Sequence, residues 1–167
     1  TLISPDEMNG KVKAALDART DKNTVIIART DAIAVEGYEC AIERAVGYVE
    51  AGADVLFIEA MQNSEQVAGA IKHFGGKIPL LVNMVEGGKT PMTPASELEE
   101  NGFSIVIFPG ALVRVLAYAA ENYFNSLLKH GSTLHHQAEM FDFEELNEIL
   151  GTEKMLELSA RYTNGNT

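Results

Sequence analysis

The chain has 167 residues and a mass of 18.1 kDa, of which 46% are hydrophobic and 22% charged. This length is sufficient for one globular domain with a buried core, which we expect to span residues 1–167. The net charge of −11 opposes binding to a phosphate backbone or an anionic membrane surface, so neither nucleic acid nor a membrane is an expected partner. A single cysteine, Cys40, cannot form an internal disulfide and favours a cytoplasmic protein.

Helical segments and short apolar strands alternate along the first two thirds of the chain. Ser4 and Glu7 form a capping-box pattern with proline at the first helical position, which predicts a helix to about Arg19. Four apolar runs rich in β-branched residues predict fully buried parallel strands at 24–28, 54–58, 79–82 and 103–108. Between them, amphipathic segments predict helices at 37–51, 64–74 and 93–102, with Ser64 and Thr93 as N-caps.

The last third of the chain is predicted to be helical. A long helix at 111–129 ends at Gly131, and two shorter helices follow at 143–150 and 153–162. We expect residues 163–167 to form a frayed tail. Cys40 lies inside the helix predicted at 37–51, where we expect a buried structural thiol rather than a nucleophile.

The repeat of strand and helix defines the fold class. Strands that recur every roughly 25 to 30 residues predict an α/β protein, and this chain holds about four βα units of the eight in a TIM-type barrel. The repeat by itself also permits an open, doubly wound sheet that binds a phosphorylated ligand. That fold would need a glycine-rich turn after the first strand, and residues 29–32 are not one. The lone leading helix favours half of a barrel.

Ligands of parallel α/β folds bind at the carboxyl ends of the strands. The first strand is followed by Arg29 and Asp31, the second by Glu59 and the third by Asn83. Arg29 can bind a carboxylate in bidentate fashion, or it can neutralise the two neighbouring carboxylates. Glu59 can serve as a base, as a group near a metal or as an orienter of Arg29, and it can equally be a solvated strand end. Asn83 can hydrogen-bond a carbonyl oxygen of a ligand, or it can stabilise a loop through hydrogen bonds.

Two further segments lie at the predicted strand ends. Glu86, Gly87, Gly88 and Thr90 lie in a glycine-containing loop, and Pro109 follows the fourth strand. The loop lacks the spacing of a nucleotide-binding phosphate loop, which excludes a nucleoside triphosphatase. We interpret it as a mobile active-site loop, although a plain connection between strand and helix fits its composition equally well.

Several motifs together resemble one enzyme family. VIIARTDA at 25–32, AIERA at 41–45, AGADVLFIEA at 51–60 and NMVEGGKTP at 83–91 are similar to the isocitrate lyase and phosphoenolpyruvate mutase superfamily, as are FEELN and LELSARY near the C-terminus. The resemblance covers nearly the whole chain. It is nearest to the branch of carboxyvinyl-carboxyphosphonate phosphorylmutases, oxaloacetate hydrolases and methylisocitrate-type lyases. Members make or break C–C or P–C bonds next to a carboxylate.

The resemblance implies a fold, a cofactor and a set of roles. It implies a (β/α)8 barrel with Mg²⁺ and an enolate-like species at the strand ends, in a homo-oligomer that exchanges its C-terminal helix. The four strands would be the fifth to eighth. Arg29 would bind the carboxylate of a small substrate, Glu59 would line the pocket near metal and substrate, and Asn83 would bind substrate oxygens. Residues 86–90 would form part of the mouth.

The same resemblance implies an incomplete site. In the family, the acidic Mg²⁺ ligands and the loop with the catalytic cysteine precede the region that this chain matches, and Cys40 does not replace that cysteine. We therefore expect a C-terminal portion of such an enzyme, acting on oxaloacetate, methylisocitrate, dimethylmalate or a phosphonate, with no turnover by this chain alone. The alternative is a non-catalytic half-barrel that associates with a partner chain through its open edge strands and the long helix that begins at Ala111. The sequence encoded before Thr1 would discriminate between them.

Overall fold

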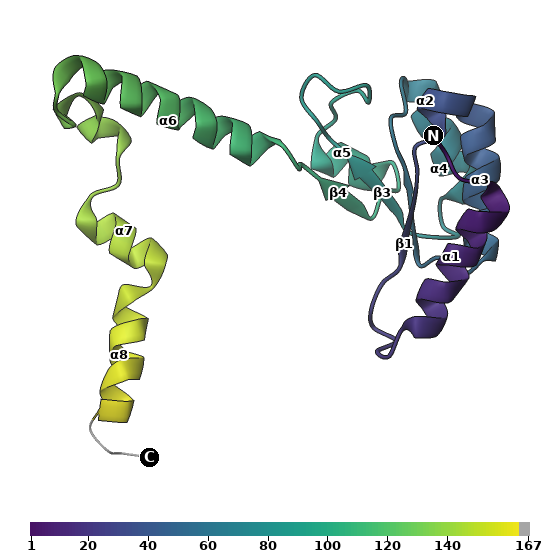
Figure 1. Cartoon of the computed structure of the whole chain (residues 1–167), viewed down its shortest axis with the longest axis horizontal. Helices are drawn as coiled ribbons and strands as arrows, with labels where there is room; N and C mark the ends of the chain where they lie inside the picture. The colour runs from purple at the N-terminus through teal and green to yellow at the C-terminus, as the bar shows by residue number, and fades with distance from the viewer. Residues whose placement is uncertain (164–167) are drawn as a thin grey trace. The chain divides into compact units, whose positions relative to one another are not determined.

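The computed structural model describes residues 1–163 (Figure 1). Its contacts group into two compact units, Thr1–Val113 and Arg114–Thr167, and each is described by itself. We expected one domain across the chain, and that interpretation stays a prediction. The tail expected at 163–167 falls, apart from the last residue of the final helix, outside the described residues.

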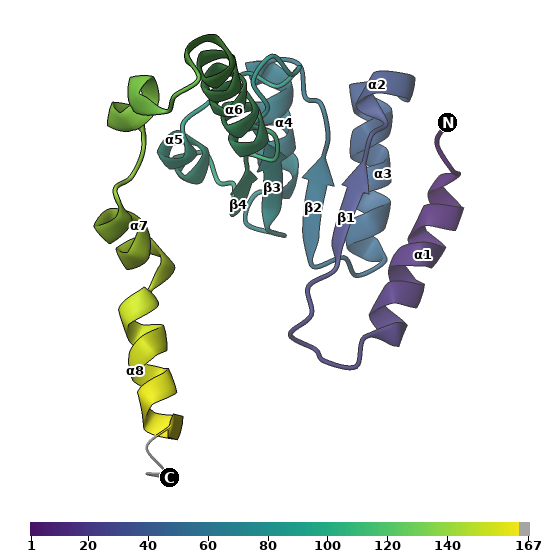
Figure 2. The same ribbon diagram turned by 60° about the vertical axis from the view of Figure 1, so that its left-hand side comes forward.

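The first unit is built on a four-stranded parallel sheet. Its strands are β1 (Ile27–Thr30), β2 (Val55–Ile58), β3 (Leu80–Asn83) and β4 (Ile105–Ile107), hydrogen-bonded in the order β1-β2-β3-β4 (Figure 2). The four predicted strands and the α/β class are thus confirmed. The first strand begins later than expected, at Ile27, and runs to Thr30, so Arg29, expected to follow the strand, lies within it.

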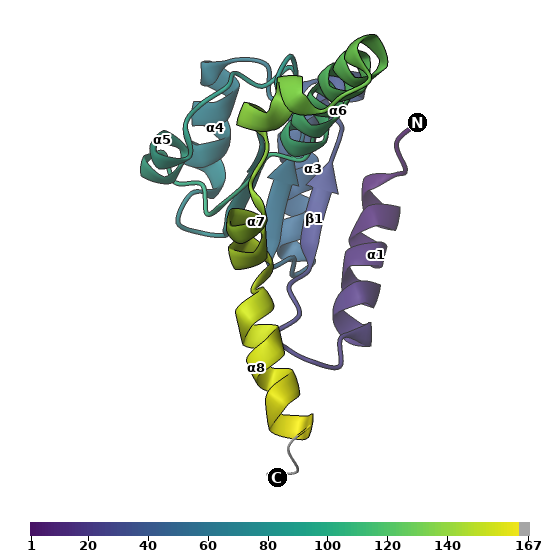
Figure 3. The same ribbon diagram turned by 90° about the vertical axis from the view of Figure 1, so that its left-hand side faces the viewer.

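Helices cover one face of this sheet. The helices are α1 (Pro5–Ala18), α2 (Ile33–Glu36), α3 (Tyr38–Glu50), α4 (Ser64–Phe74) and α5 (Ala95–Glu100). Alternate strand residues such as Leu56, Leu80 and Val82 pack with residues of these helices in the main core. Helix α1 packs on α3 and lies beyond β1 (Figures 2 and 3).

On the opposite face of the sheet, the core residues that the structure describes in the first unit all come from strands. Val55, Phe57 and Leu81 form a small second cluster there, with Ile105 and Ile107 partly buried against it. The expectation of strands buried on both faces holds for β2 but is wrong for β1, whose residues alternate between exposed and buried, and for β4, whose residues are half-buried. These two strands lie at the edges of the sheet, so each lacks a neighbour on one side among the described residues.

A buried arginine ties the start of the chain to α3. Arg44, only 8% exposed, donates from Nε and Nη2 to the two carboxylate oxygens of Glu36 at 2.8 and 3.0 Å. Its Nη1 donates to the carbonyl oxygen of Ile3 at 2.9 Å, next to the N-cap of α1. That N-cap is Ser4, whose hydroxyl accepts from the backbone N–H of Glu7 at 3.2 Å, so the predicted N-cap is confirmed. The carboxylate of Glu7 pairs with Lys11 at 2.9 Å instead of completing the predicted capping box.

Three local predictions are wrong. Helix α4 is capped by the side chain of Asn63 rather than by Ser64. Helix α5 begins at Ala95 after Pro94, because the hydroxyl of Thr93 donates to the carbonyl of Pro91 instead of capping the helix. Cys40 is exposed, since it lies on the side of α3 that faces away from the sheet. Helix α2 was not predicted, because four residues are too few to show a helical period.

The second unit contains helices only. It comprises most of α6 (Ala111–His130), a 3₁₀ helix (Leu134–Glu139), α7 (Phe143–Leu150) and α8 (Thr152–Thr163). Helix α7 begins with a complete capping box between Asp142 and Glu145. The three α-helices confirm the prediction, and the 3₁₀ helix was not predicted. Helix α6 buries none of its residues. Within residues 1–163, none of the helices is long and apolar enough to cross a membrane.

The Arg44–Glu36 pair predicts a pH-dependent contribution to stability. Hydrogen bonds from Arg44 hold the pKa of Glu36 below its ordinary value. A depressed carboxylate pKa adds stability above the pKa of the unfolded chain, and this stability is lost as the pH falls through the folded pKa. We expect Arg44→Met to lower the free energy of unfolding more at pH 7 than at pH 3, measured by urea unfolding, because the hydrogen bonds to the Glu36 carboxylate are lost.

The matched control is Lys11→Met, which removes the exposed ion pair of Lys11 with Glu7. This pair joins two flexible side chains in water, so its loss should change stability little at either pH. Equal losses for Arg44→Met at both pH values would contradict the linkage.

Candidate active site at the strand ends

The strand register brings one arginine over an aromatic ring. Arg29 pairs with Phe57 of β2, which in turn pairs with Leu81 of β3. Residues in one such row point to the same face of the sheet, here the face without helices. The guanidinium carbon of Arg29 lies 4.9 Å from the centroid of the Phe57 ring, a cation–π contact that supports the side chain from below.

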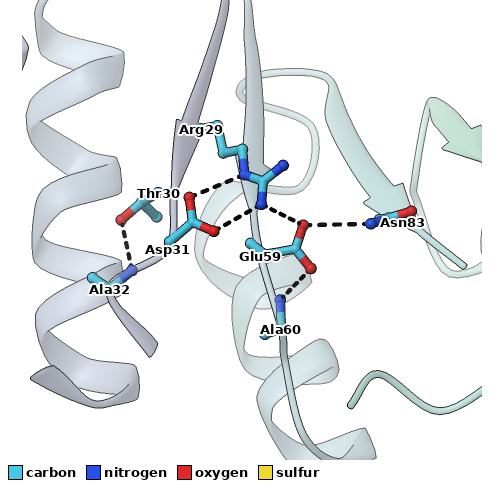
Figure 4. Close-up of polar contacts among 7 residues, drawn as sticks. All are labelled: Arg29, Thr30, Asp31, Ala32, Glu59, Ala60 and Asn83. Atoms are coloured by element: carbon cyan, nitrogen blue, oxygen red, sulfur yellow. Dashed lines mark hydrogen bonds and ion pairs between the residues drawn. The ribbon is translucent and has the colours of Figure 1, made fainter. Parts of the chain in front are cut away.

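Two carboxylates hold the Arg29 guanidinium (Figure 4). Nε donates to Oδ2 of Asp31 at 3.0 Å and Nη2 donates to Oδ1 at 2.7 Å, a bidentate pair. Nη2 also lies 3.2 Å from Oε2 of Glu59. Asp31 can reach back toward Arg29 because the hydroxyl of Thr30 accepts from the N–H of Ala32 at 3.2 Å and turns the chain after β1. The predicted strand ends therefore meet in space.

Glu59 connects this pair to the third strand. Its Oε1 accepts from the N–H of Ala60 at 3.1 Å and its Oε2 accepts from Nδ2 of Asn83 at 3.4 Å. Because a carboxylate only accepts, it orients the Asn83 amide with the nitrogen toward Glu59. The Oδ1 of Asn83 is buried and has no hydrogen-bond partner. Asn83 thus keeps one buried acceptor without a hydrogen-bond donor among the described residues.

The electrostatics of this network follow from its composition. One guanidinium faces two carboxylates, and the side chains of Arg29 and Asp31 are half exposed while that of Glu59 is 19% exposed. The hydrogen bonds with Asp31, together with the charges of Asp31 and Glu59, raise the pKa of Arg29 above its ordinary value despite partial burial. Arg29 therefore stays charged and oriented. In the resting structure it neutralises the two neighbouring carboxylates, which is one of the two roles that the sequence left open for it.

Part of the loop after β3 approaches the network. A pocket of about 210 Å³ is lined by two network residues and by loop residues, namely Glu59, Ala60, Asn83, Val85, Gly88, Lys89 and Thr90. Gly87 has a φ of +77°, and a Cβ on Gly88 would lie 2.9 Å from the Val85 carbonyl oxygen, so the loop conformation requires both glycines.

The other predicted residues lie outside this pocket. Glu86, Gly87 and Pro109 are not among its lining residues, and Gly88 and Thr90 are. The roles predicted for all of them stay predictions. Within residues 1–163, no cluster of three or more His, Cys, Asp or Glu side chains could hold a metal ion. Both carboxylates of the site already bind Arg29, so the described residues do not fit a Mg²⁺ site of their own.

Sequence reasoning missed two residues of the site. Phe57 was assigned only to a buried strand, yet it supports Arg29. Ala60 has a φ of +62°, the only positive φ among the non-glycine residues that the structure describes, and no sequence signal indicates it. This conformation aims its N–H at the carboxylate of Glu59.

The fold and the site define a class: an α/β protein with a partial barrel whose polar groups converge at the carboxyl ends of parallel strands. The family model of phosphoenolpyruvate phosphomutase matches residues 1–128. The chain therefore belongs to the phosphoenolpyruvate mutase/isocitrate lyase superfamily, as its motifs predicted.

Two curated relatives show the range of similarity. A 2,3-dimethylmalate lyase from Eubacterium barkeri is 39% identical over 166 residues, which cover 98% of this chain and 56% of the relative. A 2-methylisocitrate lyase from Vibrio cholerae serotype O1 is 44% identical over 135 residues, covering 78% of this chain and 44% of the relative. The chain thus spans about half the length of these relatives.

Solved structures agree with this placement. A crystal structure of 2,3-dimethylmalate lyase superposes with a TM-score of 0.86 at 31% identity over 96% of this chain and 56% of that one. Oxaloacetate acetylhydrolase in complex with oxalate superposes with a TM-score of 0.86 at 30% identity, and the match covers 98% of this chain and 56% of that one. Phosphonopyruvate hydrolase in complex with oxalate and Mg²⁺ has a TM-score of 0.81 at 30% identity, and the match covers 97% of this chain and 57% of that one. The partial barrel is confirmed by these matches.

The left-handed backbone at Ala60 predicts an unusual response to glycine. A left-handed conformation costs a residue with a Cβ about 1–2 kcal/mol, which offsets the entropic cost of glycine of about 0.5–1 kcal/mol. Ala60→Gly should therefore leave the free energy of unfolding unchanged or raise it by up to about 1 kcal/mol. Urea unfolding measures the effect.

The matched control is Ala14→Gly, at an exposed position inside α1. There glycine should cost about 1 kcal/mol, its usual penalty in a helix. A loss of the same size for Ala60→Gly would contradict the strain at the site.

Proposed function

We propose that the whole protein to which this chain belongs is a Mg²⁺-dependent C–C lyase, hydrolase or phosphonomutase. Its substrates would be small α-keto or hydroxy carboxylic acids, and the reaction would pass through an enolate-like intermediate. The observation that carries the proposal is the oriented Arg29 fork beside Glu59 and Asn83 at the strand ends. The lyases and hydrolases among the relatives support it.

Arg29 would bind the carboxylate of the substrate. Its pair with Asp31 joins two half-exposed side chains, and such pairs contribute only about 0–1 kcal/mol. A substrate carboxylate can therefore displace Asp31 at small cost, while Glu59 and Phe57 keep the guanidinium in place. Arg29 would then stabilise negative charge that develops next to the carboxylate during bond cleavage.

Asn83 would recognise a donor on the substrate. Glu59 binds its Nδ2, so Oδ1, which is buried and without a partner in the resting site, is the amide atom left to accept from a substrate hydroxyl group. This preference supports a hydroxy acid among the candidate substrates, since a keto oxygen only accepts. Glu59 would act as a positioning residue for both Arg29 and Asn83.

The metal would be held by residues outside this chain. The described residues offer no ligand set for Mg²⁺, whereas phosphonopyruvate hydrolase was solved with oxalate and Mg²⁺. When bound, Mg²⁺ would supply charge stabilisation for an enolate oxygen. We place the protein in the cytoplasm, on the basis of its single cysteine and its metabolic relatives.

The protein would form a homo-oligomer through α6. Its apolar residues Leu112, Val115 and Leu116 are 57–68% exposed, an unusual state for one face of a 20-residue amphipathic helix. A second copy that receives this helix in exchange would bury them, as the family resemblance implies.

Oxalate, a mimic of the enolate, tests the function by calorimetric titration with and without Mg²⁺. The chain alone should show no Mg²⁺-dependent binding. A fusion of the residues of 2,3-dimethylmalate lyase that precede its matched region to this chain should bind oxalate only with Mg²⁺. Arg29→Lys in that fusion should weaken binding about tenfold, because lysine cannot form the bidentate pair.

Each other outcome contradicts a defined part of the proposal. Mg²⁺-dependent binding by the chain alone would place the metal ligands within it. A fusion that is folded by circular dichroism but does not bind, or binds equally well with Arg29→Lys, would overturn the role of the site. Glu100→Gln, at an exposed position on α5 away from the network, is the control variant and should leave binding unchanged.

The role of α6 is tested by Leu116→Glu. A charge in the middle of the apolar face should lower the oligomeric state, measured by light scattering during gel filtration. Glu121→Gln, on the same helix, is the control that should not change it. An unchanged mass for Leu116→Glu would contradict exchange of this helix.

A further inference from the structure

A second pocket lies between α4, β3 and α5, on the face of the sheet that the helices cover. Its volume is about 250 Å³. Its apolar wall consists of Val67, Ala68 and Ile71 from α4, Val82 and Met84 from β3, and Leu98 from α5. These three elements follow one another along the chain, so residues 64–101 alone supply every wall of the pocket.

The end of β3 separates this pocket from the candidate active site. Successive residues of a strand point to opposite faces of the sheet. Asn83 accordingly lines the pocket at the candidate active site, while Val82 and Met84 line the pocket beside α4. Thr90, in the loop after β3, lines both pockets. A molecule bound beside α4 would therefore contact the loop that borders the candidate active site.

Polar residues complete the lining of the pocket beside α4. They are Ser64, Thr90, Thr93, Glu97 and Asn101. Glu97 is the only charged residue among the residues that line this pocket. The hydroxyl of Thr93 donates to the carbonyl of Pro91 at 3.3 Å, so its oxygen can still accept from a ligand. The pocket thus combines an apolar wall with hydrogen-bond acceptors and one negative charge.

The charges around this pocket favour a cation over an anion. Helix α5 contains three glutamates and no lysine or arginine. Lys72, His73 and Lys89 are close in sequence to lining residues but do not line the pocket themselves. The N-terminus of α4 carries only a partial positive charge, and the side chain of Asn63 already caps it. A carboxylate ligand would face Glu97 without a basic partner, whereas Glu97 would attract an ammonium group.

We propose that the pocket beside α4 binds a small aliphatic amine. The alkyl part lies against the apolar wall, and the ammonium group pairs with Glu97 and donates to the hydroxyl oxygen of Thr93. An apolar protein cavity of about 150 Å³ holds benzene, so this pocket admits an alkylamine of about six non-hydrogen atoms. The bound amine supports Thr90 from the side opposite the candidate active site and holds the loop after β3 in its present conformation. This binding goes beyond the proposed function.

Three probes of similar shape test the pocket: 3-methylbutylamine, 3-methylbutanol and 3-methylbutanoate. Each is titrated into the chain up to about 50 mM while amide chemical shifts are followed by NMR. The amine should give saturable shifts at residues 64–71 and 82–101. It should bind about threefold more tightly than the alcohol, because an ion pair at a partly exposed site adds a modest attraction. The carboxylate should give no saturable shifts there.

Variants of the lining residues separate the charge from the apolar wall. Glu97→Gln should remove the preference for the amine over the alcohol. Glu100→Gln, at an exposed position of the same helix outside the pocket, is the matched control and should keep the preference. Ala68→Leu, at an exposed lining position, fills the pocket and should abolish the binding of both probes while circular dichroism stays unchanged.

Hydrogen exchange of the Gly88 amide, which donates to the Val85 carbonyl at 2.8 Å, reports on the loop. It should slow by up to about tenfold when the amine is present at about ten times its Kd. Unchanged exchange would overturn the link to the loop. No saturable shifts with the amine, saturable binding of the carboxylate, a preference that survives Glu97→Gln, or binding that survives Ala68→Leu would each overturn the amine site. None of these results depends on oxalate or Mg²⁺, so the proposed activity can fail or hold separately.

Discussion

The parallel register of β1, β2 and β3 is the constraint on which the site depends. It pairs Arg29 with Phe57 and brings the carboxyl ends of neighbouring strands side by side. Asp31, Glu59 and Asn83 lie at these ends and are therefore close together. A slip of one residue in β1 would move Arg29 to the face covered by helices and bury an unpaired charge. The core on that face holds the register, because residues such as Ala28 and Leu56 pack there against the helices.

The side chain of Arg29 has a fixed orientation, but its ion pair with Asp31 contributes little to stability. Arg29 is bound by Asp31 and Glu59 and supported by Phe57, yet it remains half exposed. An arginine of this kind can exchange one carboxylate for another without reorganising the sheet. Its neighbours are the carboxylate of Glu59, which orients it, and the amide of Asn83, whose oxygen is buried without a hydrogen-bond partner. The relatives that the chain resembles include a 2,3-dimethylmalate lyase and an oxaloacetate acetylhydrolase.

Two surfaces of the chain are incompletely covered. Among the described residues, β1 and β4 each have a neighbouring strand on one side only, and α6 has an apolar face without buried residues. Apolar groups and unpaired strand edges in water are unfavourable, so both surfaces favour association.

Composition, periodicity and motif spacing determined the α/β class, the four strands, the long helices and the residues at the strand ends, because these features arise from local propensity and from the side of an element that is buried. The same patterns identified the family. They missed the left-handed Ala60, the support of Arg29 by Phe57, the exposure of Cys40 and the true caps of α4 and α5. Each of these depends on which segments meet in space. The sequence left open whether Arg29 neutralises carboxylates or awaits a ligand, and only the tertiary structure, by bringing Asp31 and Glu59 within hydrogen-bonding distance, decided that its resting partners are these two carboxylates.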